Sequence, residues 1–461
     1  MNLNLSRSTA VFIIIAWAVV GLMNPMGAAE QPAINPLAPV IPPRTFTITD
    51  FGAVGDGTTM NTAAFRATID ACAKAGGGHV IVPPGIFVTA PFELHSGMDL
   101  HLVKGATIQM SRRVDDYPAT KGERLGFITA TDATDVQISG EGTIDGQGEP
   151  WWAAFRRTKD AAAPNTAPRR PQMITFTRCE RVKLEGMTTR NPPNTHCSLR
   201  QCQDVTIDGL TMQAPADSPN TDALNLNVRN AVVRNCHIAT GDDNIVFLAS
   251  APAKGGTPGV ENVLVSHCEL GVGHGLSFGS FTSGGIRNVT VENVTFEGTT
   301  AGLRMKAARD RGGLVENLTF KNITMKNVKY PIFISSYYPR EPKRPDEDET
   351  QVVGAKTPQW KNITIDGGTI RDCPNAILIW GLREQPVMGV TLKNLSISSE
   401  HGATIYHAKD VRFEKVELRA ETGVPLTTFN AQVEGMFATP LAPPAAKPKP
   451  SPVEKPKASL P

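Results

Sequence analysis

One kind of turn residue recurs along the chain and constrains its fold more than any other feature of the sequence. Ten segments, the first at residue 135, align as a strand, a turn and a second short strand, and nine of their ten sixth residues are Gly, Asn or His. These residue types adopt positive φ more readily than most others, so each segment is predicted to turn at the same place. The segments begin at Asp135, Arg181, Asp204, Asn230, Asn262, Asn288, Asn317, Asn362, Gly389 and Asp410. Their sixth residues are Gly140, Gly186, Gly209, Asn235, His267, Asn293, Asn322, Gly367, Asn394 and Lys415.

The spacing of these turns predicts a parallel β-helix. Most of them follow one another at intervals of 21 to 32 residues, a period typical of solenoids. Apolar residues alternate around each turn, as Val289 and Val291 do before Asn293, and such positions would face a common core. A ten-stranded antiparallel sandwich is the alternative, but it gives no reason for one turn chemistry to recur at this period. We therefore expect an all-β, single-stranded parallel β-helix.

The two ends of the chain differ in composition from the repeats. Residues 1–29 resemble an export signal, with Arg7 before an apolar run and small residues at 27–29. A membrane anchor is the alternative, but the run is shorter than the ~20 residues that a spanning helix needs. We expect cleavage of this signal, a secreted or periplasmic protein, and no stable membrane span afterwards.

Changes in composition along the chain also set the remaining domain boundaries. Residues 30–44 are rich in proline and are predicted to form a linker. The β-helix domain is expected over residues 45–436. Residues 437–461 alternate Pro, Ala and Lys and carry too few apolar side chains to form a core, so disorder is predicted.

Within the domain, residues 60–75 carry apolar side chains at helical spacing and end at three glycines. We expect an N-terminal helix here that caps the β-helix, followed by strands over residues 79–82 and 99–108. The two longest intervals between turns contain insertions at residues 145–172 and 337–359, and long loops on a repeat scaffold commonly form the rim of a binding cleft.

Parts of both insertions can be interpreted in more than one way. Trp151 and Trp152 could stack on a sugar or simply pack against the scaffold, and the sequence leaves both open. The charged segment 340–349 is interpreted as a solvated surface loop.

The cysteines and the net charge narrow the possible partners. The chain has seven cysteines and no CxxC pair, so no zinc site is assigned. Cys236 and Cys268 share one phase of the repeat, as do Cys179 and Cys202, and could be stacked thiols or disulfides. A net charge of +2, with both signs mixed along the chain, gives no reason to expect nucleic acid or a membrane surface as a partner.

Four short polar groups recur at about the same phase of the repeat. They are Asn220-Thr221-Asp222, Gly241-Asp242-Asp243, Gly273-His274-Gly275 and Arg304-Met305-Lys306. Asp222 precedes Asp242 and Asp243 by about one coil, and stacked coils lie ~4.8 Å apart. Three carboxyl groups this close cannot all ionise easily, so the pKa of at least one should rise. A protonated carboxyl beside ionised ones provides the acid and the base that glycoside hydrolysis requires.

The cationic group points to an acidic ligand. Arg304 and Lys306 alternate in a strand and should face the same side. Arginine can bind a carboxylate through two parallel hydrogen bonds, which suits an anionic sugar. Each group alone could be structural, as a turn cap or a surface ion pair. All four in phase favour a functional site.

At these positions the sequence resembles the family 28 glycoside hydrolases, the polygalacturonases and their relatives. The four motifs are similar in residue type, order and spacing, and the similarity runs from about Phe46 to about Ala420. Two departures stand out, Ala223 where the family usually has glycine and Met305 where isoleucine is commoner. Further similar segments are Asp50-Phe51-Gly52-Ala53, Gly55-Asp56-Gly57 and Asp145-Gly146-Gln147-Gly148.

The resemblance implies a fold, a reaction and a role for each site residue. It implies a right-handed parallel β-helix that hydrolyses α-1,4-linked galacturonan with inversion, without a cofactor or metal. Asp242 would be the general acid, supported by His274, while Asp222 and Asp243 would activate water. The substrate-binding residues would be Arg304, Lys306, Asn220 and Tyr338.

Other functions remain open at this point. The substrate would be a pectic polysaccharide or oligogalacturonide, and a monomer is expected. The alternatives are hydrolysis of rhamnogalacturonan or xylogalacturonan, a β-helix polysaccharide lyase, and a non-catalytic glycan-binding protein.

Overall fold

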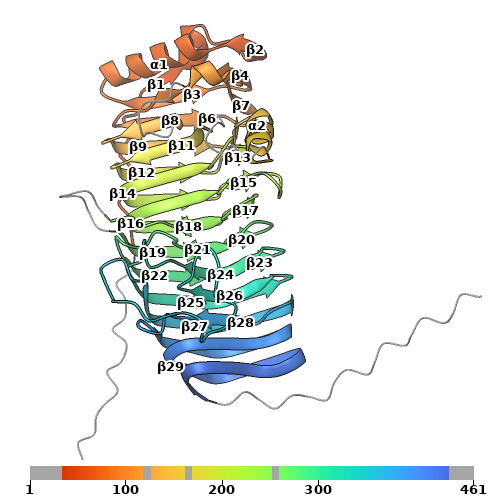
Figure 1. Ribbon diagram of the computed structural model, residues 1–461. Coiled ribbons are helices and arrows are strands. Elements are labelled where there is room, and N and C mark those ends of the chain that lie inside the picture. Colours follow the sequence, from red (N-terminus) through yellow and green to blue (C-terminus); the bar gives the residue numbers. More distant parts are fainter. Residues whose placement is uncertain (1–33, 118–125, 161–168, 252–258, 436–461) are drawn as a thin grey trace, which may run out of the picture. The chain divides into compact units, whose positions relative to one another are not determined.

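The computed structural model describes residues 34–117, 126–160, 169–251 and 259–435. The predicted signal at 1–29 and the predicted tail at 437–461 lie outside these ranges. The described strands form one continuous stack of parallel pairings, with each strand paired to those one coil before and after it (Figure 1). The predicted right-handed parallel β-helix is therefore confirmed.

Each coil contributes strands to three rows, and paired strands run parallel within a row. The first row contains β1 (Thr45–Thr47), β3 (Gly78–Val82), β6 (Met98–Leu102), β9 (Thr134–Gly140), β12 (Glu180–Glu185), β14 (Cys197–Asp208), β16 (Leu224–Arg234), β19 (Val260–Ser266), β22 (Ile286–Glu292), β25 (Leu314–Lys326), β27 (Gln359–Cys373) and β29 (Val387–Glu434). The second contains β2 (Asp56–Met60), β4 (Gly85–Thr89), β7 (Ala106–Met110), β10 (Thr143–Asp145), β13 (Thr188–Arg190), β15 (Thr211–Gln213), β17 (His237–Ala239), β20 (Glu269–Leu270) and β23 (Thr295–Glu297).

The third row carries the motifs and is called the site row here. It contains β5 (Phe92–Glu93), β8 (Gly126–Thr131), β11 (Gln172–Thr177), the first parts of β14 and β16, β18 (Ile245–Phe247), β21 (Leu276–Phe278), β24 (Ala301–Lys306), β26 (Tyr330–Ser335) and β28 (Ile377–Trp380).

Left-handed residues close the coils where the sequence predicted them. All ten sixth residues have positive φ, from 52° at Asn322 to 102° at Gly140, and Lys415 is among them. All ten first residues of the segments also have positive φ, between 50° and 67°, which the sequence reasoning did not predict. Two left-handed positions five residues apart therefore bend the chain on each coil.

Side-chain amides stack along both columns of left-handed residues. In the first column, Asn317 donates to Asn288 Oδ1 at 3.1 Å and accepts from Asn362 Nδ2 at 3.2 Å. In the second column, Asn322 donates to Asn293 Oδ1 at 3.2 Å. Such amide ladders satisfy the polar side chains at each turn and offset the backbone strain of a non-glycine residue at positive φ.

The interior is a continuous apolar core. The alternating residues around the turns, such as Val289, Val291 and Phe320, are fully buried. Phe278 packs against Phe247 and Phe320, with ring centroids 5.2 and 5.9 Å apart, so aromatic rings stack from coil to coil. All seven cysteines are buried free thiols, which decides between the two possibilities that the sequence left open.

The N-terminal end is covered by α1 (Thr62–Lys74), whose buried face includes Phe65, Ile69 and Cys72. This helix lies within the residues 60–75 predicted for it. Short 3-10 helices, η1 (Ile48–Phe51) and η2 (Val114–Asp116), flank the first coils. The single strand predicted over 99–108 is wrong, because β6 and β7 are separate strands with a turn at Gly105, where φ is 86°.

Residues 34–44, within the predicted linker, lie against the β-helix. Leu37 N donates to Asp204 Oδ1 at 3.3 Å, and Val40 N donates to Asp135 Oδ1 at 2.9 Å. Both acceptors belong to the first column of left-handed residues. This part of the segment is thus fixed to the coils.

The first insertion contains α2 (Glu149–Asp160). Trp151 and Trp152 are only 3% and 5% exposed. Trp151 packs edge-on against Tyr117, and Trp152 Nε1 donates to Pro192 O at 3.0 Å. Both tryptophans therefore pack against the scaffold, and neither is available to stack on a sugar.

The second insertion, residues 337–359, has no helix or strand before β27 begins at Gln359, but it is anchored at several points. Arg309 bridges Asp348 and Glu384, and the Tyr337 hydroxyl donates to Asp348 at 2.8 Å. His407 Nε2 lies 2.9 Å from Pro345 O. The segment 340–349 is thus solvated in part but attached to the scaffold.

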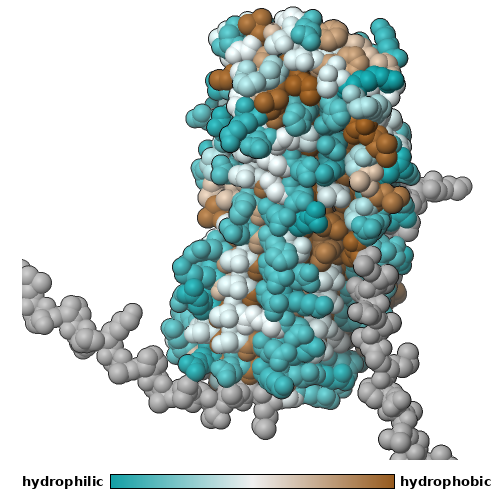
Figure 2. Space-filling view, turned by 180° about the vertical axis from the view of Figure 1, so that it is seen from behind, coloured by the Kyte–Doolittle hydropathy of each residue, from teal (hydrophilic) through white to brown (hydrophobic). Residues whose placement is uncertain are grey.

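The face shown in Figure 2 is mostly hydrophilic, with hydrophobic side chains in separate patches. None of the helices in the described ranges is long and apolar enough to cross a membrane.

Replacing Asn317 by alanine tests the ladder. Alanine adopts positive φ poorly and cannot bond to the neighbouring amides, so we expect the free energy of unfolding to fall by about 1–3 kcal/mol. Asn317→Gly keeps the backbone conformation, so its free energy of unfolding should fall less. The control is Lys321→Ala, at an exposed position of β25 outside the ladder. Equal urea-unfolding midpoints for Asn317→Ala and Lys321→Ala would contradict the role of the ladder.

Candidate active site

The register of the site row brings the four motifs together. Leu224, Ile245 and Leu276 pair on consecutive coils, and Ser277 pairs with Arg304 on the next. Two positions before the three paired apolar residues stand Asp222, Asp243 and His274. The predicted placement of the motifs one coil apart is therefore correct.

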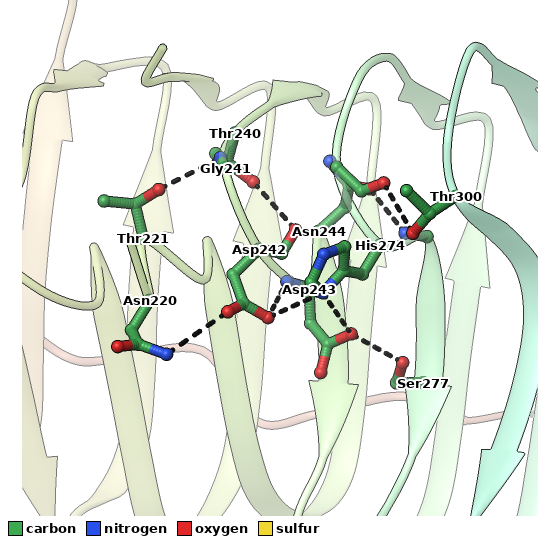
Figure 3. Close-up of polar contacts among 12 residues, drawn as sticks. Asn220, Thr221, Thr240, Gly241, Asp242, Asp243, Asn244, His274, Ser277 and Thr300 are labelled. Atoms are coloured by element: carbon green, nitrogen blue, oxygen red, sulfur yellow. Dashed lines mark hydrogen bonds and ion pairs between the residues drawn. The ribbon is translucent and has the colours of Figure 1, made fainter. Parts of the chain in front are cut away.

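Local hydrogen bonds fix the turns that carry the acidic residues (Figure 3). Thr221 Oγ1 accepts from Gly241 N at 3.0 Å, which ties the first motif to the second. Asn244 Oδ1 accepts from Gly275 N at 2.8 Å, which ties the second to the third. Gly273 has φ 141°, and a Cβ there would lie 2.6 Å from the Asn244 amide. A glycine is thus required before His274.

Asp242 and His274 form a hydrogen-bonded pair, with His274 Nδ1 2.9 Å from Asp242 Oδ1. Burial alone would raise the pKa of Asp242, but the hydrogen bond and charge of His274 outweigh it, so this pKa lies below its ordinary value. The same hydrogen bond raises the pKa of His274. The pair therefore favours a proton on the imidazole in the free protein.

Asp243 is held by cations and a hydroxyl. Its Oδ2 lies 2.7 Å from Lys306 Nζ, and its Oδ1 accepts from Ser277 Oγ at 2.8 Å and lies 3.5 Å from Arg304 Nη1. The Asp243 and Lys306 side chains are only 7% and 6% exposed, whereas Arg304 is 23% exposed. Lys306 is thus committed to Asp243, and Arg304 is the more accessible of the two cations predicted to bind substrate.

Asp222 is the carboxyl whose pKa is raised. Burial, followed by the negative charges of Asp242 and Asp243, raises its pKa to about 7, while Asn225 and Lys306 oppose the shift. The sequence predicted that at least one of the three pKa values would rise. In the structure this group is Asp222, and not Asp242, the residue expected to be the acid.

Asn220 connects the acidic cluster to the first insertion. Its Nδ2 donates to Asp242 Oδ2 at 3.4 Å, and its Oδ1 accepts from Arg170 Nη2 at 2.6 Å. The Arg170 guanidinium also lies over the Phe155 ring of α2, 4.2 Å from its centroid. Sequence reasoning missed Arg170 because it ends a basic run in an insertion, where no repeat position indicates its direction. Ser277 was missed as well, although its place in the strand after His274 could have indicated it.

Tyr338 extends the site into the second insertion. Its ring lies 5.5 Å from Lys306 Nζ, and its backbone N donates to Ala307 O at 3.0 Å. Together with Arg304 and Lys306 it lines a cavity of about 270 Å³. Tyr338 therefore lies where the sequence resemblance placed it, next to the cationic motif.

The cluster has some features of a metal site. Ligand atoms of Asp242, Asp243 and His274 lie within 4.8 Å of one another. However, Lys306 and Arg304 already place positive charge 2.7 and 3.5 Å from Asp243, which would repel a further cation. The arrangement suits proton transfer beside an anionic group better than it suits metal binding.

The fold and site together define a parallel β-helix protein that gathers carboxyl groups, a histidine and cations, and carboxyl groups are the side chains on which most glycoside hydrolases rely. Residues 72–418 match the family model "Glycosyl hydrolases family 28". The chain therefore belongs to family 28 of the glycoside hydrolases.

Individual relatives are similar along much of the chain. An endo-polygalacturonase of Pectobacterium carotovorum is 29% identical over 72% of this chain and 81% of its own length. A probable polygalacturonase of Arabidopsis thaliana is 33% identical over 63% of this chain, and the match spans 60% of that relative. The solved structure of an exopolygalacturonase from Thermotoga maritima has a TM-score of 0.67 and 25% identity, covering 87% of this chain and 94% of that one.

The raised pKa of Asp222 predicts a pH-dependent stability. The ordinary pKa is 3.8 and the folded value is about 7, so the unfolded chain releases this proton first and stability falls as pH rises between these values. Asp222→Asn should match the wild type near about pH 4 and be more stable by about 1–2 kcal/mol near about pH 8, allowing for screening by water. Urea unfolding at several pH values measures this, and a difference that does not vary with pH would contradict it.

Proposed function

We propose that this protein is an exported hydrolase that cleaves α-1,4-galacturonosidic linkages of pectin and inverts the anomeric carbon. One observation carries the proposal: three carboxyl groups, a histidine and two cations meet at one point of the site row. Several relatives are named polygalacturonases, which supports galacturonan as the polymer. The signal predicted at residues 1–29 would deliver the protein to the periplasm or beyond the cell.

Asp242 is the proposed general acid, with His274 as its proton source. The free protein favours the proton on His274 Nδ1, 2.9 Å from Asp242 Oδ1. As negative charge develops on the glycosidic oxygen, this proton can pass to Asp242 and on to the leaving group. His274 is then a positioning and proton-holding residue behind the acid.

Asp222 and Asp243 are the proposed activators of water. Asp243 is oriented by Lys306, Ser277 and Arg304, so one of its lone pairs can be fixed toward the attacking water. Asp222 acts as a base only when it has lost its proton, which its pKa of about 7 places near neutrality. The same pKa makes Asp222 an alternative proton donor, and experiment can separate the two assignments.

A leaving-group comparison distinguishes these assignments. Asp242→Asn should lower kcat on polygalacturonate by about 10²–10⁴-fold, since it removes general acid catalysis. On an aryl α-galacturonide, whose phenolate leaves without protonation, the loss should be much smaller. Asp222→Asn should lose activity on both substrates. If instead Asp222→Asn is the variant that keeps most of its kcat on the aryl α-galacturonide, Asp222 is the acid.

Replacing Arg304 and replacing Lys306 should change different kinetic constants. Arg304 faces the cavity, so Arg304→Met should raise KM for oligogalacturonides about tenfold with a smaller effect on kcat. Lys306 is bound to Asp243, so Lys306→Met should mainly lower kcat. Steady-state kinetics on oligogalacturonides measures both. An unchanged KM for Arg304→Met would contradict its role as a carboxylate ligand.

The product identifies the reaction class. A hydrolase releases saturated reducing ends, and we expect this release to continue in the presence of a calcium chelator. New ultraviolet absorbance that depends on calcium would mean a lyase. Release from rhamnogalacturonan or xylogalacturonan but not from polygalacturonate would move the proposal to another pectic chain. No reducing-end release from any of these would leave a glycan-binding protein.

A further inference from the structure

The outward side chains of the site row change character on either side of the carboxyl cluster. One column runs through Ser277 and Arg304 by strand pairing. On the N-terminal side it contains Thr175, Ser198 and Asn225, which carry hydroxyl and amide groups, and Val246 stands at the level of the cluster between Asn225 and Ser277. On the C-terminal side, Arg304 pairs with Phe333 and Phe333 pairs with Leu378. The floor is therefore polar before the cluster and apolar after it.

A second outward column, two residues further along each strand, changes in the same way. Before the cluster it contains Arg200 and Asn227. After the cluster, Lys306 is followed by Ser335, Trp380 and Tyr406. The first column thus becomes apolar at Phe333, immediately beyond Arg304, and the second becomes aromatic one coil later, at Trp380.

The second insertion closes this apolar floor into a cavity. The cavity of about 270 Å³ that begins at Arg304 and Lys306 continues over Phe333 and Leu378. Tyr330 stands beside Phe333, with ring centroids 5.8 Å apart, and the insertion supplies Tyr338 and Glu341. This space lies next to the proposed carboxylate-binding residues and is large enough to be a site of its own.

Arg304 and Lys306, which also line the cavity, are assigned above to the acidic sugar and to Asp243, so Glu341 and Lys329 are the charged side chains left for a neighbouring sugar. Glu341 is half-buried, and its Oε1 accepts from Ser335 Oγ at 2.7 Å, which holds the carboxylate in the wall. Lys329 is exposed, and its ammonium lies over the Tyr330 ring, 5.4 Å from the centroid. Water screens the exposed Lys329 more than the half-buried Glu341. A free uronate carboxylate here would meet an apolar floor and a like charge.

The position of Glu341 is fixed by the scaffold. Tyr337 packs with Trp380 and Leu382 in a second hydrophobic cluster outside the main core. Its hydroxyl bonds to Asp348, which Arg309 holds in turn. The insertion therefore keeps a defined conformation over the floor.

We propose that this cavity is a sugar subsite beyond the carboxylate-binding residues and that it takes an uncharged residue, either a methyl-esterified galacturonate or a neutral sugar. The inference rests on the proposed function. A methyl ester removes the repulsion from Glu341 and places a methyl group on Phe333 and Leu378, where its burial is favourable. The enzyme would then prefer pectin in which the sugar next to the bound acid is esterified.

A position scan tests the inference. The substrates are hexagalacturonate, a series carrying one methyl ester at each position in turn, and hexamers with galactose at the preferred position. We expect one mono-ester to have a kcat/KM about three- to tenfold above the parent, the size expected from removing a half-screened like charge. The galactose hexamer shows whether loss of the charge suffices or the ester itself is recognised. If it is hydrolysed as fast as the preferred mono-ester, the charge alone decides the preference.

Variants assign the preference to the cavity. Glu341→Gln retains an acceptor for Ser335 and should raise kcat/KM on the parent about three- to tenfold while changing the preferred mono-ester less than twofold. Phe333→Ser should lower kcat/KM on that mono-ester more than on the parent. Glu347→Gln, an exposed change in the same insertion outside the cavity, is the matched control and should leave the preference unchanged.

The possible failures are distinct. If the wild type hydrolyses hexagalacturonate but prefers no mono-ester, or if Glu341→Gln shifts all substrates equally, the subsite inference is wrong and the proposed function stands. If the wild type hydrolyses no member of the series, the proposed function itself fails.

Discussion

The whole structure depends on parallel strand pairing in unbroken register from one coil to the next. Because stacked strands lie ~4.8 Å apart, residues that are 20 to 30 positions apart in sequence become neighbours. Asp243 and Lys306 are 63 residues apart and still form a 2.7 Å ion pair. The left-handed residues at both turns of each coil keep this register, since they return the chain to the same row every time. The register thus aligns the turns that carry the acidic residues, and the two insertions add Arg170 and Tyr338 around them.

Within the site, positive charge is distributed unevenly over three carboxyl groups. Lys306 is largely buried against Asp243, His274 holds Asp242, and Asp222 forms no ion pair with the described residues. The pKa of Asp222 rises because burial penalises its charged form and the charges of Asp242 and Asp243 add to this effect. Substrate binding would change this distribution by adding a further carboxylate next to Arg304.

The sequence was sufficient for features that repeat and insufficient for those that occur once. Turn residues recur with a period, so the β-helix, the positions of the left-handed sixth residues and the alignment of the four motifs could all be predicted. The first left-handed column was missed although nine of its ten members are Asn, Asp or Gly, with Arg181 as the exception, so this signal was present in the sequence. The roles of Arg170 and Glu341 depend on how each insertion folds back, which no repeat constrains. The assignment of the raised pKa to Asp222 required burial and distances that spacing alone does not give.

The amide ladders also give the stack a direction. Asn288, Asn317 and Asn362 each donate to the coil before, and the oxygens of Asn288 and Asn317 accept from the coil after. The second column repeats this polarity, since Asn322 and Asn394 also donate backward. A growing stack therefore presents acceptors to the segment that follows it in sequence. The N-terminal side of each coil presents amide donors in turn, so the two ends of a ladder are chemically different.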